Sequence, residues 1–523
     1  MFDQLAVAAA GACGAGAVGA WARVENAACA RRLFAIADVL VARMSAEDCV
    51  EREQWCVDNW DAVAAEVAAA HDVSLGVASH QLLIAMALRE RLPRVAEVFA
   101  TGRISYRQVN AIVYRTALIR DTAAQASVDV ELAAAAVGWG SMSVAKVEAA
   151  IDYWVDRVDP DAVRRIETSV RGRHVDVVDA ANGTGVSYLQ ATLLSQDGAA
   201  LDQRLEAMAG AVCAADPRTL DQRRSDALGA LGHGADRLQC LCGKLDCDAA
   251  AKTLSAVVIN VIAEQDSLTD DTAARLDGAE APPPSTAELR KMSIAQALAQ
   301  PAPTGSPNTK PAVVMGGAML PAPLLAAKLA TTAVIRPVIH PGDSPPEPRY
   351  VPSAVLARFV RCRDLTCRFP GCDEPADHCD LDHTIPYPDG PTCASNIKCL
   401  CRKHHLLKTF CGWSDRQLPD GTVIWTSPSG QTSTTYPGSR LLFPSLCRPT
   451  APVTTPTNAA SAQPGRALKM PRRTSTRAQD RANRIDAERA RNHEFRQNLE
   501  NDCDDAYFPT RPPPPDTDDP PPF

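Results

Sequence analysis

The first third of the chain, over residues 21–158, carries apolar side chains at the three- and four-residue spacing of amphipathic helices. After Gly102, Ser105 and Gln108 form a capping box, the pair that exchanges hydrogen bonds at the start of a helix. This pattern predicts helices and no large sheet. The clearest examples of the spacing are Leu33, Ile36, Ala37 and Leu40, followed by Trp60, Val63 and Val67.

The pattern changes in the middle of the chain. Seven prolines over residues 281–311, with Gly, Ser and Thr and no apolar period, predict a linker. Consecutive valine and isoleucine over residues 255–262 predict a short buried strand, which a small sheet would contain. Further elements are predicted at residues 319–335 (helix), at residues 354–360 (helix) and at Asp420-Gly421 (hairpin turn).

Composition indicates a globular protein, because 523 residues with 46% apolar side chains are enough for several domains. The formal charge of −8 argues against nucleic acid bound over the whole surface. Residues 466–496 nevertheless contain ten Lys or Arg against four acids, which suits either a DNA-binding arm or an unstructured tail that aids solubility. No window is apolar enough to span a bilayer, so no membrane partner is expected.

Eight of the eighteen cysteines lie within residues 362–411. Such clustering favours metal binding over disulfides. The N-terminus has Asp3 and no basic residues before its apolar run, so no signal peptide is expected. Both observations indicate a cytoplasmic protein. Two short ligand pairs, or knuckles, are Cys367 with Cys372 and Cys401 with His404. Together they can form one structural Zn²⁺ site, because thiolates and imidazoles suit tetrahedral zinc. Free thiols are the alternative, and Cys379 competes as a ligand. The four expected ligands are Cys367, Cys372, Cys401 and His404.

Three further thiols, Cys240, Cys242 and Cys247, lie within eight residues. They suggest a second metal site. The interpretation as buried or unused cysteines is favoured, because no fourth ligand is evident from the sequence.

Harder ligands lie between the two knuckles and directly after the second one. Asp382 and His405 can bind Mg²⁺ or Mn²⁺ and leave positions for a phosphate, while His383 can take a proton from the attacking water. Asn396 can orient the imidazole or a loop carbonyl. This set predicts hydrolysis of phosphodiester bonds.

The same residues resemble the HNH endonuclease family, which folds as a ββα-metal hairpin and helix. The resemblance implies that Asp382 is the first metal ligand, His383 the general base, Asn396 the middle asparagine and His405 the last metal ligand. Two departures concern the zinc site: the first knuckle has four residues between its cysteines where many members have two, and His404 stands where many have cysteine.

A wider resemblance covers roughly residues 20–445. The chain is similar to HNH proteins with an N-terminal domain of unknown function 222, also called thirteen-E-twelve repeat proteins. This resemblance does not imply a function for the helical domain. The resemblance rests on Leu92-Pro93, residues 102–105, Arg218-Thr219 through Asp226-Ala227-Leu228, and Arg349-Tyr350.

The expected fold is mainly α: a large helical N-terminal domain with a small sheet, then a small zinc-supported HNH unit and a disordered C-terminal tail. We assign residues 1–280 to the helical domain of unknown function, 281–311 to a Pro-rich linker, 312–352 to a helical connector, 353–428 to the HNH nuclease domain, and 449–523 to the tail, with one optional helix at residues 476–499.

The leading hypothesis is a metal-dependent DNA endonuclease. The alternatives are a DNA-binding or mobile-element protein with a weak or silent nuclease fold, and a zinc-supported interaction module. The presence of His383, Asn396 and His405 together discriminates between these hypotheses. A module that only binds would need the four zinc ligands but has no need of these three residues. Oligomeric state stays open. Several cations near the site can contact DNA phosphates; the alternative is that they are solvated surface charges. The foremost candidates are Arg402 and Lys403, followed by Arg361, Arg363, Arg368, Lys398 and Lys408.

Overall fold

The computed structural model divides into two compact units, Met1–Thr168 with Arg466–Phe523, and Ser169–Gly465. The expected boundary at residue 280 therefore differs from the division at residue 168. No described helix is long and apolar enough to cross a membrane. The structure describes residues 2–45, 49–140, 142–164, 174–179, 186–193, 195–244, 246–250, 259–270, 290–293, 310–315, 319–328, 333–453 and 469–507.

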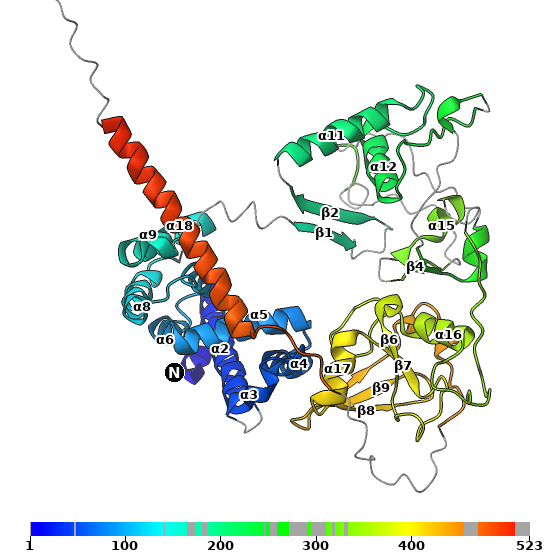
Figure 1. Ribbon diagram of the computed structural model, residues 1–523, viewed down its shortest axis with the longest axis horizontal. Helices are drawn as coiled ribbons and strands as arrows, with labels where there is room; N and C mark the ends of the chain where they lie inside the picture. The colour runs from blue at the N-terminus through cyan, green and yellow to red at the C-terminus, as the bar shows by residue number, and fades with distance from the viewer. Residues whose placement is uncertain are drawn as a thin grey trace, which may run out of the picture. The chain divides into compact units, whose positions relative to one another are not determined.

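The first unit is a bundle of helices, as the apolar spacing predicts (Figure 1). Its core is made mainly of small aliphatic side chains, and Leu33, Ala37 and Val63 of the predicted stripes are buried in it. The mainly α fold class is confirmed. The helices are α1 (Phe2–Ala10), α2 (Gly14–Met44), α3 (Cys49–Arg52), α4 (Asn59–His71), α5 (Leu75–Glu90), α6 (Pro93–Ala100), α7 (Tyr106–Arg115), α8 (Thr122–Ala136), α9 (Val144–Val158) and the 3-10 turn η1 (Pro160–Ala162).

Local signals in the sequence set the helix boundaries. Ser105 and Gln108 form the predicted capping box at the start of α7, and Pro93 is the first residue of α6. Gly102, between these helices, has φ +75°, and a Cβ there would lie 2.1 Å from the backbone oxygen of Arg23 in α2. Only glycine permits this close approach.

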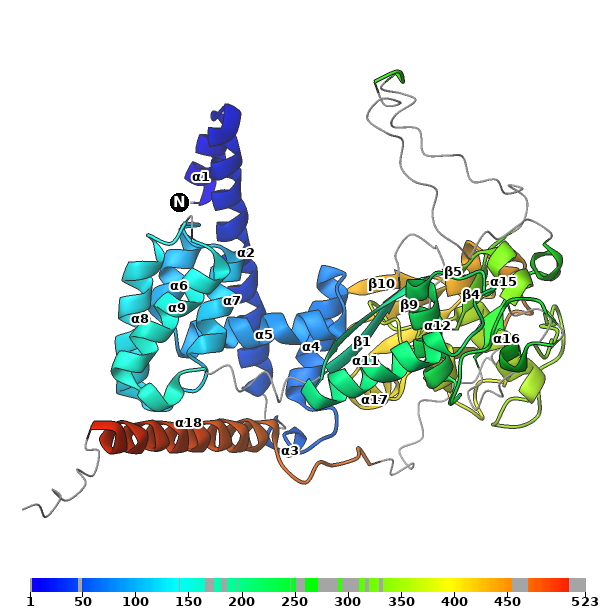
Figure 2. The ribbon, with the colours of Figure 1, turned by 90° about the horizontal axis from the view of Figure 1, so that it is seen from above.

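Helix α18 (Arg477–Tyr507) belongs to the same unit and runs along its helices (Figure 2). It occupies a region where disorder with one optional helix was expected. Asp58 and Asp61 at the start of α4 are buried, and Arg473 and Arg477 pair with both of them. Since a buried carboxylate needs a partner, these pairs attach α18 to the bundle.

The second unit begins with helices and small sheets. The predicted strand keeps only β3 (Val261–Ile262), since residues 255–258 lie outside the described residues, as does most of the linker 281–311. The predicted helix 319–335 is corrected: Leu320 pairs with Ala312, and Pro321 ends the strand before a short helix. The elements are β1 (His174–Asp179), β2 (Ser187–Thr192), α11 (Ser195–Gly210), α12 (Leu220–Gly232), η2 (Asp248–Ala250), η3 (Gln265–Thr269), β4 (Ala312–Val314), β5 (Met319–Leu320) and α15 (Ala322–Lys328).

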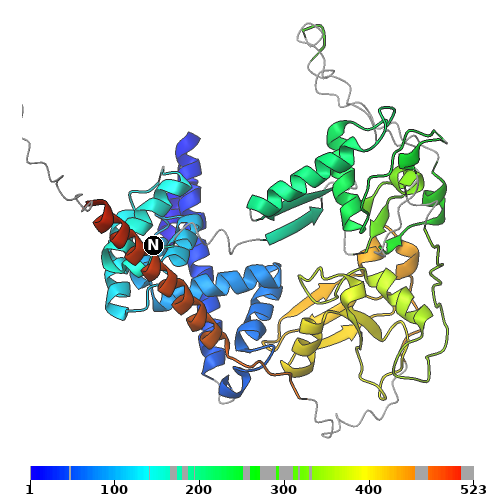
Figure 3. The same cartoon turned by 45° about the horizontal axis from the view of Figure 1, so that its top comes forward.

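Residues 333–453 form the part that carries the predicted chemistry (Figure 3). Trp425 and Phe369 are buried at its centre, and the predicted turn at Gly421, with φ +83°, joins two antiparallel strands. The elements are α16 (Ala354–Asp364), η4 (Ala376–His378), β6 (Asp380–His383), β7 (Ile397–Leu400), α17 (Arg402–Phe410), β8 (Ser414–Gln417), β9 (Val423–Thr426), β10 (Thr432–Thr435), η5 (Gly438–Arg440) and η6 (Pro444–Cys447).

The attachment of α18 generates a stability prediction. Arg489 donates to both carboxylate oxygens of Asp159, at 2.6 and 3.1 Å, and to the backbone oxygen of Leu118 at 3.0 Å. Arg489→Ala should lower the free energy of unfolding by about 1–2 kcal/mol, because it removes partly buried, charge-assisted hydrogen bonds. Urea denaturation followed by circular dichroism measures this. The matched control is Arg484→Ala on the same helix, with an expected change below about 0.5 kcal/mol; equal effects of both variants would contradict the attachment.

Candidate active site and metal centre

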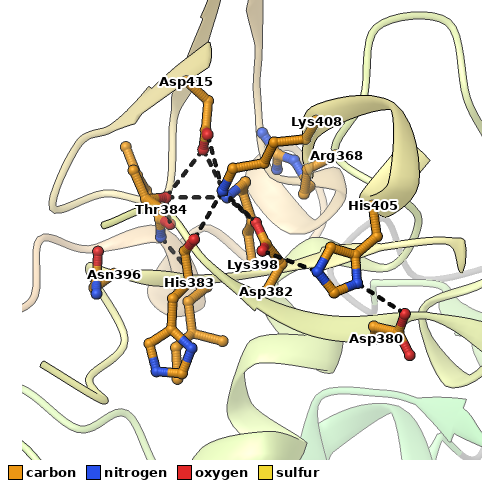
Figure 4. A network of polar contacts seen from close by, with 12 residues as sticks. Arg368, Asp380, Asp382, His383, Thr384, Asn396, Lys398, His405, Lys408 and Asp415 are labelled. Atoms are coloured by element: carbon orange, nitrogen blue, oxygen red, sulfur yellow. Dashed lines mark hydrogen bonds and ion pairs between the residues drawn. The ribbon is translucent and has the colours of Figure 1, made fainter. Parts of the chain in front are cut away.

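Two strands and one helix bring the predicted residues together. β6 and β7 pair antiparallel, with Asp382 opposite Lys398, so both side chains lie on one face of the hairpin. Helix α17 begins directly after β7, and His405 and Lys408 lie three residues apart, on one face of that helix. The backbone therefore places Asp382, Lys398, His405 and Lys408 beside one another (Figure 4).

An ionic network fills the centre of this arrangement. Lys398 Nζ lies 2.7 Å from Asp382 Oδ2 and 2.6 Å from Asp415 Oδ2. Lys408 Nζ lies 2.6 Å from Asp382 Oδ2 and 3.0 Å from Asp415 Oδ1. Burial raises the pKa of Asp382, but the two ammonium groups outweigh burial and bring the pKa below its ordinary value. Asp382 is therefore an ionised carboxylate although it is buried.

His405 faces the other oxygen of Asp382. Its Nδ1 lies 3.0 Å from Asp380 Oδ2, which orients the ring, and its Nε2 lies 3.4 Å from Asp382 Oδ1. If Nδ1 carries the proton, the Nε2 lone pair and the Asp382 oxygen face each other. Adjacent ligands of an octahedral Mg²⁺ lie about 3 Å apart, so this pair of atoms fits two positions of such an ion. The same geometry also suits a protonated His405 in an ion pair with both aspartates.

His383 points away from the lysines, as Figure 4 shows. Its Nε2 lies 2.9 Å from Thr392 Oγ1, and that hydroxyl in turn donates to the backbone oxygen of Tyr350 at 3.5 Å. If the Thr392 hydroxyl gives its single proton to Tyr350, Nε2 donates to Thr392 and Nδ1 carries the lone pair. The Tyr350 ring stacks on the imidazole at 5.4 Å. Burial is the main cause that lowers the pKa of His383, so the ring is neutral at pH 7.

Asn396 fixes the loop after His383, but not the imidazole. Its Oδ1 accepts from the backbone N–H of Ile385 at 2.9 Å, and its Nδ2 donates to the oxygens of Ile385 and Pro391 at 3.0 and 2.8 Å. Gly390 closes over this amide, since a Cβ there would lie 2.7 Å from Asn396 Nδ2. Of the two roles expected for Asn396, the structure contains the contact with loop carbonyls, and Thr392 holds the imidazole.

The soft ligands form a separate cluster. The ligand atoms of Cys367, Cys372, Cys401 and His404 all lie within 4.8 Å of one another, and this group can hold a metal ion. His404 Nδ1 faces the sulfurs of Cys401 at 3.1 Å and Cys367 at 3.5 Å, and its ring stacks on Phe369 at 4.1 Å. Cys379, the competing candidate, lies outside this group, and its thiol donates to the backbone oxygen of Pro375 at 3.3 Å. The donor set of three sulfurs and one nitrogen suits zinc.

The cations near the site divide by exposure. Arg363, Arg368 and Lys398 are buried, and Lys398 and Arg363 make short ion pairs with Asp382 and Asp364. They stabilise the fold and are not available to a phosphate. Arg402 keeps 72% of its side chain exposed and lies 3.2 Å from Asp380. Of the two foremost DNA-binding candidates, Arg402 is thus at the surface beside the His405 pair, and Lys403 is half-buried next to it.

Sequence reasoning missed several residues that complete the site. Asp415 comes from β8, and Thr392 and Tyr350 come from segments before β7 and α16. None belongs to the motif that identifies the other residues. Asp380 was the one member with a local signal, because it lies on β6 two residues before Asp382 and therefore on the same strand face.

The fold and this site define a mainly helical protein with a cysteine-rich hairpin and helix. Comparison with known proteins gives the family: the model described as Domain of unknown function (DUF222) matches residues 20–364, and the chain belongs to this family. It is 49% identical over 481 residues to the uncharacterized protein Rv2100 of Mycobacterium tuberculosis, covering 91% of this chain and 86% of the relative. It is 48% identical over 475 residues to the uncharacterized protein Rv3776 of that organism, covering 90% and 88%. No solved structure matches the chain.

The cluster at the start of α17 generates a metal-binding prediction. Cys401→Ser should reduce the bound metal by one ion per chain and lower the thermal midpoint, because metal bound to folded protein contributes to folding energy. Elemental analysis and thermal unfolding of the purified full chain measure both quantities. Cys379→Ser is the matched control, a neighbouring buried thiol outside the cluster, and should keep the ion. Equal metal content in the two variants would remove Cys401 from the ligand set.

Proposed function

We propose that the chain is a metal-dependent HNH endonuclease that hydrolyses phosphodiester bonds of DNA. The observation that carries the proposal is the pair of atoms Asp382 Oδ1 and His405 Nε2, 3.4 Å apart on a hairpin and the helix after it. An ionised carboxylate and an oriented imidazole nitrogen are the protein ligands that such a reaction needs. A bound Mg²⁺ or Mn²⁺ would neutralise charge on the scissile phosphate.

His383 is the proposed general base. In the tautomer in which Nε2 donates to Thr392, Nδ1 has the lone pair that would take the proton of the attacking water. Asn396 supports this step indirectly, because it holds the loop that follows His383 and joins it to Pro391, next to Thr392. Proton transfer by a fixed side chain contributes roughly 10²–10⁴-fold to the rate of such reactions.

The lysines keep Asp382 ionised and leave one of its oxygens toward His405. Their contacts go to Oδ2, while Oδ1 faces His405, so the two carboxylate oxygens have separate partners. Lys408 also donates to the backbone oxygen of His383 at 2.7 Å, which connects α17 to the residue proposed as base. The proposed zinc at Cys367, Cys372, Cys401 and His404 has a structural role. It would fix the start of α17, on which His405 lies directly after His404.

A second candidate function is DNA binding without cleavage. Its support is the same ionic network, since two lysines already neutralise Asp382 and Asp415, and His383 is only 6% exposed. A carboxylate with two ammonium partners attracts a divalent ion less strongly than a free one. Because the two candidate functions differ only in cleavage, DNA cleavage and DNA binding need separate measurements.

The cleavage prediction concerns the proposed base. With Mg²⁺ or Mn²⁺, the full chain should nick supercoiled plasmid, and His383→Ala should slow nicking by about 10²-fold or more, since water then lacks a base. Agarose gels followed over time measure the rates. His378→Ala is the matched control, an exposed histidine on η4, and should nick like the wild type.

Two further arms complete this test. Asp382→Asn should raise the Mg²⁺ concentration needed for half-maximal nicking, because it removes the ligand charge, and chelator should stop nicking. Equal rates for wild type and His383→Ala would remove His383 from the mechanism. Binding of DNA with no nicking under any divalent ion would favour the second candidate.

The surface cation generates a binding prediction. Arg402→Ala should weaken binding of duplex DNA to a similar degree for different sequences, and should reduce by about one the slope of log affinity against log salt. Fluorescence anisotropy at several salt concentrations measures both. Arg416→Ala, an exposed arginine on β8, is the control. An unchanged salt slope in Arg402→Ala would place DNA elsewhere.

A further inference from the structure

Four cysteines from two separate segments meet in the second unit, in a group that shares no residue with the site proposed for catalysis. The sulfurs of Cys213, Cys240, Cys242 and Cys247 all lie within 4.8 Å of one another. Cys213 follows α11, whereas the other three follow α12, so the chain supplies the fourth thiol from before that helix. This is the ligand that the spacing of the later three did not reveal.

The backbone around the thiols is fixed by polar contacts. Asp216 Oδ2 accepts from the N–H of Leu241, between two of the cysteines, at 2.9 Å. Arg218 pairs with Asp216 at 2.7 Å and donates to the oxygen of Gln239 at 2.7 Å. Both side chains are buried, so this ion pair joins the Cys213 segment to the Cys240 segment.

The remaining thiols are placed by the turn that follows. Gly243, directly after Cys242, has φ +71°, a left-handed conformation that reverses the chain. Cys240 N–H donates to the oxygen of Ala249 at 2.8 Å, which brings the end of the loop back to its beginning. The loop is therefore built so that its thiols converge.

The chemistry of four thiols at this spacing points to one class of ligand. Sulfurs bound to a tetrahedral zinc at about 2.3 Å lie about 3.8 Å apart. Cys213 and Cys240 sulfurs are 3.5 Å apart, far beyond a disulfide bond of about 2.05 Å and close to the edge of such a tetrahedron. Four thiolates without an open position are typical of a structural site.

The size of the local core gives a reason for a metal. Among the described residues, the buried apolar cluster around these cysteines is small. Its buried members are Met208, Val212, Ala227, Leu238 and Cys240, with partly buried side chains such as Leu205 and Leu231 packed against them. So small a core stabilises little, and units of this kind are commonly stabilised by metal or disulfides.

We propose that Cys213, Cys240, Cys242 and Cys247 bind a second, structural zinc ion that fixes α11 against α12. This site is independent of the proposed nuclease centre, since it shares no residue with it. Removal of this zinc ion is expected to destabilise residues 195–250 before the rest of the chain.

The test counts zinc per full-length chain by elemental analysis after purification in reducing buffer. Wild type should contain about two ions, Cys242→Ser and Cys401→Ser about one each, and the double variant almost none, since each site needs all four ligands. Cys13→Ser, an exposed thiol, is the control with about two. If the cluster of Cys367, Cys372, Cys401 and His404 bound no zinc, the zinc content of Cys401→Ser would match that of the wild type, and Cys242→Ser would contain no zinc.

Differential alkylation of the unaltered protein covers the case in which Cys242→Ser does not fold. Mass spectrometry should find the four thiols protected together, released by a strong chelator, while Cys13 reacts at once. Alkylation of the four at the rate of Cys13, a disulfide among them, or iron in place of zinc would overturn the proposal. Limited proteolysis after chelation should cut first within residues 195–250.

Discussion

The pairing of Lys398 and Lys408 with Asp382 and Asp415 is the interaction on which the candidate site depends. A buried charge without a partner is costly, so none of the four side chains can be where it is without the others. The pairs connect β6, β7, β8 and α17. The position of Asp382, and of the His405 ring that faces it, follows from this network.

The sulfur cluster adds a constraint at the start of helix α17. His404 and His405 are adjacent on α17, and their rings serve different groups: one faces the cysteines and stacks on Phe369, the other faces Asp380 and Asp382. A rotation of α17 would disrupt both at once. The hairpin and the helix are therefore held by charge pairing on one side and by the cysteine cluster on the other.

Sequence predicts those parts of the molecule that local chemistry encodes. The helical stripes, the Ser105 capping box, the turn at Gly421 and the grouping of Cys367, Cys372, Cys401 and His404 are all present, because each depends on residue types at short spacing. Partners that come from distant segments could not be found that way. Asp415 and Cys213 complete sites whose other members lie elsewhere along the chain, and only the tertiary fold brings them there.

Charge counted along the chain also differs from charge presented to a partner. The basic stretch at residues 466–496 suggested a DNA-binding arm, yet Arg473, Arg477, Arg489 and Arg496 pair with aspartates of their own unit. Lys398 is likewise used inside the fold. A cation that already neutralises a buried carboxylate attracts a phosphate weakly, because binding the phosphate would leave that carboxylate unpaired. In the proposed function, contacts to DNA would come from exposed cations such as Arg402, which can turn from Asp380 to a phosphate with little loss, since surface ion pairs contribute at most about 1 kcal/mol.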